Sequence, residues 1–134
     1  MNLKNSLIGL MLMAVSAGAM AEWTKISGGV STNTFSYADL SSIRKSGSTA
    51  KIWILIDHNE VKTTPNGKSY LSVMERFEYD CNEEKSRGLS IYFYSGNMKN
   101  GDIVESVDTE ENQWHSILPE SVGATHLKIA CGAK

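Results

Sequence analysis

The stretch SYLSVMERFEYDC, residues 69–81, has the clearest hydrophobic pattern in the sequence and decides its fold class. Apolar residues recur at every second position and share one face, which only Glu75 interrupts. These residues are Leu71, Val73, Phe77, Tyr79 and Cys81. The positions between them form a more polar face of Tyr70, Ser72, Met74, Arg76, Glu78 and Asp80. Because a helix would scatter both sets around its circumference, the pattern predicts one long β-strand.

Further strands are predicted on both sides of this stretch. Residues 51–57 (KIWILID) are almost continuously apolar, which indicates a central strand covered on both faces, with Trp53 in the core. The turn at 64–67 contains Asn-Gly, which accommodates positive φ. Shorter strands are expected over 23–27, 34–37, 89–94 and 103–107. Between the strands we expect a single turn at 39–43 capped by Asp39, a charged turn at 82–88 and a solvated loop at 108–112.

The C-terminal segment changes to a helical period. Ala124, Leu127 and Cys131 recur at helical spacing, and Gly132 suits the end of a helix. Pro119 suits a first helical turn, and Glu120 would then lie near the positive end of the helix dipole. We predict a helix of about three turns that ends near Cys131 and packs on the sheet.

Length and composition indicate one globular domain. The chain has 134 residues, of which 41% are hydrophobic and 21% charged, and its formal charge is −2. These values argue against disorder, collagen-like repeats and coiled coil. The mildly acidic balance gives no basic face for nucleic acid. The body of the chain has no uncharged apolar run of about 18 residues, which excludes a multi-span membrane protein.

Residues 1–21 are predicted to be a cleaved signal peptide, with the mature domain over 22–134. Lys4 gives a positive start, residues 7–15 form a short apolar stretch, and Ala19-Met20-Ala21 places small residues before the cleavage point. The alternative is an uncleaved anchor helix, although the apolar stretch is too short to span about 30 Å of hydrocarbon. No cysteine precedes Cys81, so we expect a periplasmic or secreted protein without a lipoprotein anchor and without a transmembrane segment in the mature chain.

Two cysteines in an exported chain indicate one disulfide, between Cys81 and Cys131. The bond would close a loop of about 51 residues, for which chain entropy gives about 4 kcal/mol of stabilisation. It would pin the last turn of the predicted helix to the end of the long strand. A free nucleophilic thiol is the alternative interpretation.

No catalytic constellation is evident, so we predict no enzyme activity, no metal site and no cofactor. The sequence lacks a G-x-S-x-G elbow, a Walker-type loop and an H-E-x-x-H motif. His58, His115 and His126 are scattered and are expected to be surface or interface histidines. Glu78 and Asp80 place two carboxylates on one strand face about 7 Å apart at Cα, as a glycosidase pair would need. A polar outward face beside Arg76 explains this pair equally well.

Candidate binding residues lie on the strand at 89–94 and just before it. Tyr92 and Tyr94 share a face opposite Leu89, Ile91 and Phe93, and Arg87 lies near them. Tyrosine and arginine are frequent contact anchors, so Arg87, Tyr92 and Tyr94 are the candidates. The alternative is that the C-terminal helix covers this face and the rings belong to the core.

A series of segments, in order and spacing, resembles the bacterial surface-adhesin protein E family over essentially the whole mature chain. The segments are Trp23, Tyr37 to Arg44, Lys51 to Asp57, Ser72, Glu78 to Cys81, Tyr94 to Met98, Trp114, Pro119 to Ser121 and Cys131. The resemblance implies an exported α+β domain, in which a short C-terminal helix packs on an antiparallel sheet of about six strands. The namesake of the family is a Gram-negative outer-membrane protein that attaches to host cells and matrix proteins. The namesake is a lipoprotein, and this sequence departs from it by lacking the acylated cysteine.

Together these observations predict a non-enzymatic, exported binding module, adhesin-like, that recognises a host matrix or envelope protein through a sheet face or edge. The alternative is a soluble periplasmic protein that inhibits or assists another envelope protein. A small hydrolase is a third hypothesis.

Overall fold

The computed structural model describes residues 22–108 and 110–132, so the predicted signal peptide at 1–21 lies outside the described residues. The elements are β1 (Trp23–Gly29), η1 (Val30–Thr32), β2 (Thr34–Ser46), β3 (Thr49–Thr63), β4 (Ser69–Asp80), β5 (Lys85–Tyr94), η2 (Asn97–Lys99), β6 (Ile103–Val107), β7 (His115–Ser116) and α1 (Val122–Gly132). No helix within these ranges is long and apolar enough to cross a membrane.

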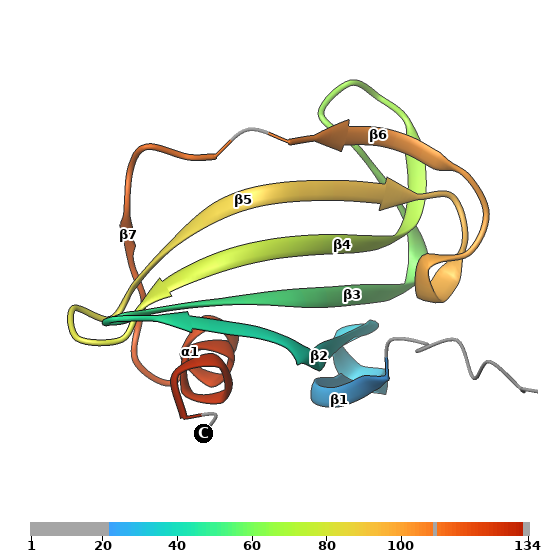
Figure 1. The fold of residues 1–134 in the computed structure, drawn as a ribbon. Coiled ribbons are helices and arrows are strands. Elements are labelled where there is room, and N and C mark those ends of the chain that lie inside the picture. Colours follow the sequence, from blue (N-terminus) through green and yellow to red (C-terminus); the bar gives the residue numbers. More distant parts are fainter. Residues whose placement is uncertain (1–21, 109, 133–134) are drawn as a thin grey trace, which may run out of the picture.

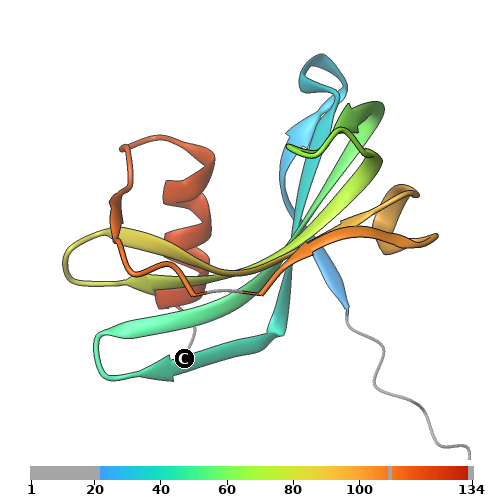
Figure 2. The same cartoon turned by 90° about the horizontal axis from the view of Figure 1, so that it is seen from above.

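The strands form one antiparallel sheet in the order β1-β2-β3-β4-β5-β6, so each strand pairs with the next one along the chain (Figure 1). The short β7 returns to pair with the first residues of β5, where Lys85 lies opposite Ser116. Helix α1 lies against one face of the sheet, as the view from above shows (Figure 2). The predicted α+β fold, with an antiparallel sheet, a short C-terminal helix and one disulfide, is therefore confirmed.

The register of the central strands assigns every side chain to one of two faces. Ile52 lies opposite Phe77, and Ile54 lies opposite Ala38 on β2. These side chains face α1 and form a core that consists of Ala38, Ala50, Ile52, Ile54, Tyr79, Leu127 and Ala130. Ile52 and Ile54 have no exposed surface, and burial of such a side chain contributes about 1.5–3 kcal/mol. We call this face the helix face and the opposite one the open face.

Several boundaries differ from the sequence-based predictions because strand pairing continues through expected turns. Asp39 does accept the N–H of Ser41 at 3.0 Å, but it does so at an irregularity within β2 and not in a separate turn. Strand β3 extends to Thr63, and β5 begins at Lys85, inside the predicted charged turn. Backbone hydrogen bonds to the neighbouring strand extend all three elements beyond their apolar residues.

Helix α1 begins at Val122, so the prediction that Pro119 opens it was wrong. Glu120 has a φ of 61°, which lies outside the helical region and separates Pro119 from the helix. The Ser121 hydroxyl accepts the N–H of Ala124 at 3.1 Å and therefore caps the first turn. A serine hydroxyl is one of the preferred N-caps, which explains why the helix begins after it.

His126 attaches α1 to the sheet from within the helix–sheet interface. Its side chain is 5% exposed, and its Nε2 atom lies 2.8 Å from the Ser36 hydroxyl on β2. Burial lowers the pKa of His126 to about 4, so the ring is neutral at pH 7. The pair therefore adds a hydrogen bond between uncharged groups to the apolar packing of the helix.

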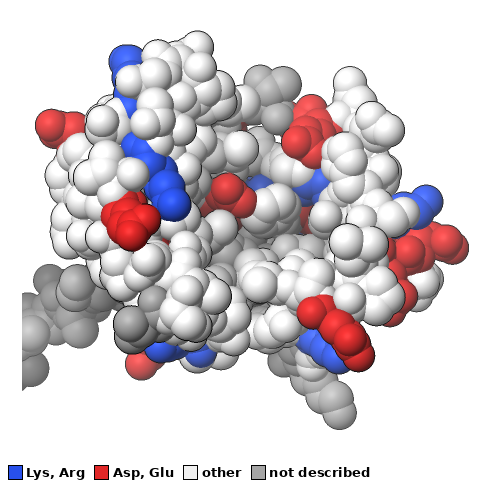
Figure 3. Space-filling model, turned by 180° about the vertical axis from the view of Figure 1, so that it is seen from behind, with Lys and Arg blue, Asp and Glu red and all other residues white. Residues whose placement is uncertain are grey.

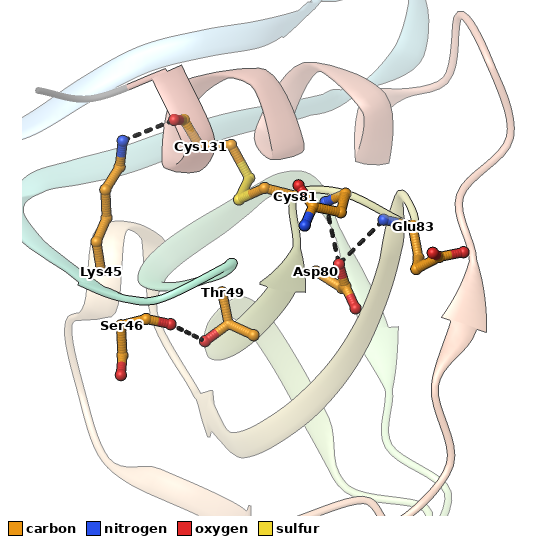
Figure 4. The surroundings of a disulfide bond; sticks show 8 residues. Lys45, Ser46, Thr49, Asp80, Cys81, Glu83 and Cys131 are labelled. Carbon is orange, nitrogen blue, oxygen red and sulfur yellow. Dashed lines mark hydrogen bonds between the residues drawn. A yellow bond between two sulfur atoms is a disulfide. The ribbon is translucent and has the colours of Figure 1, made fainter.

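The predicted disulfide is confirmed and joins the end of α1 to the residue after β4. Cys81 and Cys131 are bonded, and their Cα atoms lie 5.8 Å apart (Figure 4). The Lys45 ammonium donates a hydrogen bond to the Cys131 carbonyl at 2.7 Å. Asp80 accepts two backbone N–H groups at 3.0 Å, one of them from Glu83, and so fixes the turn that follows Cys81. The last turn of the helix is thus held covalently and by a hydrogen bond.

Replacing both cysteines with serine is expected to lower the free energy of unfolding by about 2–4 kcal/mol, because the bond restricts a long loop of the unfolded chain. Guanidinium denaturation under non-reducing conditions measures the difference. The wild-type domain denatured with a reducing agent should show a similar loss. Equal midpoints for variant and oxidised wild type would contradict the stabilising role of the bond.

Acid should weaken the attachment of α1 through His126. The ring takes up a proton near pH 6.5 in the unfolded chain but only at about 4 in the folded one. As the pH falls between these values, the unfolded state binds the proton first, and the free energy of unfolding drops by about 1–3 kcal/mol. Urea denaturation at pH 7 and pH 4.5 should show a smaller drop for His126→Gln than for the wild type. Identical pH dependence of the two proteins would exclude this group as the cause.

Candidate binding surface on the open sheet face

The open face carries large side chains that no helix covers. Trp53 of β3 lies opposite Arg76 of β4, and Met74 lies between Leu55 and Tyr92 of the neighbouring strands. Strict alternation from Ile52 and Ile54 places all of these side chains away from α1. We call Trp53, Met74, Arg76 and Tyr92 the Trp53 patch, and each of them is half-buried.

Aromatic and cationic groups hold the Trp53 patch in a defined arrangement. The rings of Trp53 and Tyr92 lie with centroids 6.1 Å apart and are tilted by 40°. The Arg76 guanidinium lies over the Trp53 ring, 5.9 Å from its centroid, which is within the range of a cation–π contact. Leu55 beside them has no exposed surface. Trp53 was predicted to lie in the core, but it lies on the open face and keeps part of its surface exposed.

One end of the open face is closed by η2, which follows β5 (Figure 1). The Asp57 carboxylate accepts the Asn97 side-chain amide at 3.1 Å and the Met98 N–H at 2.8 Å. The Ser72 hydroxyl donates to the Gly96 carbonyl at 2.6 Å and accepts the Lys99 N–H at 3.0 Å. The polar groups of β3 and β4 at this end are therefore occupied by the loop.

The other end is closed by an ion-pair cluster around Glu78. Arg87 contacts the Glu78 carboxylate at 2.6 Å and the Glu110 carboxylate at 2.5 Å. The guanidinium of Arg87 also lies 4.7 Å from the ring centroid of Trp114. Glu110 and Trp114 belong to the segment between β6 and β7, which was predicted to be a solvated loop over its acidic part. Along β4, the uncovered stretch of the open face is thus the one that carries Met74 and Arg76.

The structure places the three predicted binding residues in different surroundings. Tyr92 lies in the Trp53 patch, half-buried, and the helix does not cover it. Arg87 lies on the same face but is engaged by Glu78 and Glu110. Tyr94 is 9% exposed, and burial raises the pKa of its hydroxyl. Sequence reasoning missed Arg76, Met74 and Trp53 as members of this surface, although two of them were already on the polar face of residues 69–81.

Among the described residues of the open face, the carboxylates have ion-pair or hydrogen-bond partners, whereas one arginine side chain has none. The Asp39 carboxylate accepts both the N–H and the hydroxyl of Ser41, at 3.0 and 2.6 Å. Asp57 and Glu78 are engaged as described above. The Arg76 side chain, in contrast, makes no ion pair or hydrogen bond within residues 22–108 and 110–132. The unpaired charge at the centre of the Trp53 patch is therefore positive.

The carboxylates considered for hydrolysis have structural partners. Glu78 is paired with Arg87, and Asp80 accepts the backbone N–H groups of Asn82 and Glu83. The buried Ser36–His126 pair resembles a nucleophile and base, but both side chains are at most 5% exposed. In the described part of the chain, no three His, Cys, Asp or Glu side chains gather as metal ligands. In this arrangement, Glu78 and Asp80 hold the neighbouring chain segments in place.

Glu75 is the polar exception among the β4 side chains on the helix face, as it was in the sequence pattern. It lies opposite Ile54 and Ile91, and its neighbours on this face of β4 are Val73 and Phe77. Burial raises the pKa of its carboxyl to about 7, and the nearby Glu111 carboxylate raises it further. The folded domain therefore keeps a carboxylate charged above pH 7 at a cost in stability.

Glu75→Gln should stabilise the domain at pH 8 by about 1–3 kcal/mol and leave stability near pH 4.5 unchanged. The raised pKa favours the folded state at low pH, and this contribution is lost as the pH rises from about 4.5 through 7. Thermal unfolding of variant and wild type at both pH values measures the effect. A stability difference independent of pH would show that charge is not its cause.

The surface seen from behind has no patch of one sign. Acidic and basic side chains are distributed around a central hollow, and groups of opposite sign lie next to each other at the right-hand and lower edges (Figure 3). This distribution agrees with the small net charge of the chain. Long-range attraction of a strongly charged partner is therefore not favoured on this side.

Comparison with known families identifies the domain. The family model described as Surface-adhesin protein E matches residues 23–132. The chain belongs to the surface-adhesin protein E family. The expected family membership is thereby confirmed, and the match covers every strand and nearly all of the described residues.

Solved structures of protein E from Haemophilus influenzae share the fold. One crystal form is 16% identical with a TM-score of 0.59, and the alignment covers 86% of this chain and 91% of that chain. Protein E from non-typeable Haemophilus influenzae is 15% identical with a TM-score of 0.56, over 87% and 79% of the two chains. Among curated proteins, the search found no match to this sequence. At such low identity, the likeness establishes the fold and leaves the contact surface to be argued from this chain.

Proposed function

We propose that the mature domain is an exported, non-enzymatic binding module, adhesin-like, that contacts a host matrix or envelope protein through the Trp53 patch. The observation that carries this proposal is the uncovered stretch of the open face. The η2 segment and the Arg87 ion-pair cluster close its two ends, and half-buried aromatic, arginine and methionine side chains lie between them. Membership of an adhesin family supports the binding role. Residues 1–21 would direct export.

The composition of the Trp53 patch is that of a protein contact surface. Aromatic residues, methionine and arginine are enriched at the centres of interfaces, and tryptophan, tyrosine and arginine are the commonest hot spots. The patch lies on three long paired strands, β3, β4 and β5, so the backbone that carries its side chains is rigid. A rigid surface loses little conformational entropy on binding, which leaves more of the contact energy for affinity.

A pull-down with mature domain against host matrix proteins and against envelope extract should identify the partner class. Retention of a matrix protein would support adhesion, whereas a partner found in the envelope extract alone would favour the periplasmic alternative. Tyr92→Ala should then weaken binding of the partner by about 1–3 kcal/mol, because the variant loses an anchoring ring. Surface plasmon resonance measures the dissociation constant.

The control is Leu118→Ala, which removes an apolar side chain that is 74% exposed and lies outside the patch. It should bind like the wild type. Circular dichroism verifies that both variants are folded. If folded Tyr92→Ala and Trp53→Ala variants bind with wild-type affinity, the open face is not the contact surface.

A further inference from the structure

We propose that Arg76 binds a carboxylate on an acidic segment of the protein partner. This inference rests on the proposed function, because it names the chemistry that the Trp53 patch recognises. It follows from the way in which the arginines and carboxylates of the domain are occupied.

Arg76 differs from the other two arginines of the described residues. Arg44 donates to the carbonyls of Ser41 and Ile43, both at 2.9 Å. Arg87 is held by Glu78 and Glu110. Arg76 has only the Trp53 ring beneath it, so the hydrogen-bonding edge of its guanidinium has no partner within residues 22–108 and 110–132.

The carboxylates of the same face are engaged by other groups and do not contact Arg76 in the described residues. Asp39 is turned toward Ser41, and Asp57 holds the η2 backbone at Met98. Asp108 accepts the hydroxyl of Ser90, the residue opposite Arg76, at 2.7 Å. Glu78 is buried, with 8% of its side chain exposed, and is held by Arg87 at 2.6 Å and by Lys51 at 3.9 Å. Removing one partner of a buried ion pair is strongly destabilising, so Glu78 stays with Arg87.

The geometry of the patch favours a carboxylate ligand. A guanidinium presents a planar fork of N–H donors that matches the two oxygens of a carboxylate. The Trp53 contact restrains the Arg76 side chain before binding, which lowers the entropy lost when the ion pair forms. Half-buried Met74 and Tyr92 flank the fork and would exclude water from the pair.

The patch favours a protein segment over an acidic polysaccharide. Sugar rings stack on bare aromatic faces, but the Trp53 ring already carries Arg76 and packs near Tyr92. The neighbouring Met74 and the fully buried Leu55 offer an apolar floor, which suits the side chains of a polypeptide. An acidic segment with interspersed apolar or aromatic residues therefore fits best.

The test uses immobilised random copolymer of glutamate and tyrosine as the acidic polypeptide probe, with hyaluronate and poly-lysine as comparisons. Wild-type mature domain should bind the copolymer and bind neither comparison polymer. Arg76→Gln should weaken copolymer binding at least tenfold, because loss of a hydrogen bond between charged groups lowers affinity by about one order of magnitude or more. Arg76→Lys should retain part of the affinity. Raising the salt concentration should reduce the wild-type affinity toward that of Arg76→Gln.

Lys128→Gln is the matched control, because it removes one positive charge from an exposed position on α1. It should bind the copolymer like the wild type. Hyaluronate binding that depends on Arg76, without copolymer binding, would overturn the inference in favour of an acidic polysaccharide. Both variants are then tested with the partner from the pull-down. If folded Arg76→Gln binds this partner normally and Tyr92→Ala does not, the role of Arg76 is refuted and the proposed function stands. Normal binding by both variants would refute the proposed function as well.

Discussion

The pairing of β3 with β4 is the constraint on which the rest of the domain depends. Ile52 lies opposite Phe77, and the next pair, Trp53 with Arg76, points to the other side of the sheet. A slip of one residue would exchange the two faces, because side chains alternate along a strand. It would place Arg76 against α1 and expose Ile52 and Ile54. Loss of the burial of these two side chains would cost several kcal/mol. The core therefore fixes the register, and the register places the Trp53 patch.

In the proposed function, the helix face stabilises the domain and the open face binds the partner. Helix α1 packs on the helix face and is held there by apolar packing, by the Ser36–His126 hydrogen bond and by the Cys81–Cys131 bond. The open face is closed only at its ends, by η2 over Asp57 and by the Arg87 cluster over Glu78. Since the helix supplies the larger core, the middle of the open face is left uncovered and can retain half-exposed aromatic side chains without unfolding the sheet.

Much of the fold could be predicted from sequence because alternation in residues 69–81 reports directly on strand faces. The same pattern placed Arg76 and Met74 on the polar face and marked Glu75 as an exception. The position of Trp53 could not be predicted, since residues 51–57 are apolar at nearly every position and carry no sign of which face is covered. Strand register also lies beyond local patterns, so the contact between Arg76 and Trp53 was not foreseeable. The closure of the open face depends on Met98 and Glu110, which are distant in sequence from the groups they meet.

The central claim is that the covered face stabilises the domain and the open face binds the partner. Nuclear magnetic resonance of the isotope-labelled mature domain, titrated with the partner from the pull-down, tests this most directly. The account predicts that the Trp53 indole N–H, the Arg76 Nε–H and the Met74 methyl signals shift, while Leu127 and Ala130 in α1 keep their positions. Shifts confined to α1 and the helix face, with the open-face signals unchanged, would contradict it.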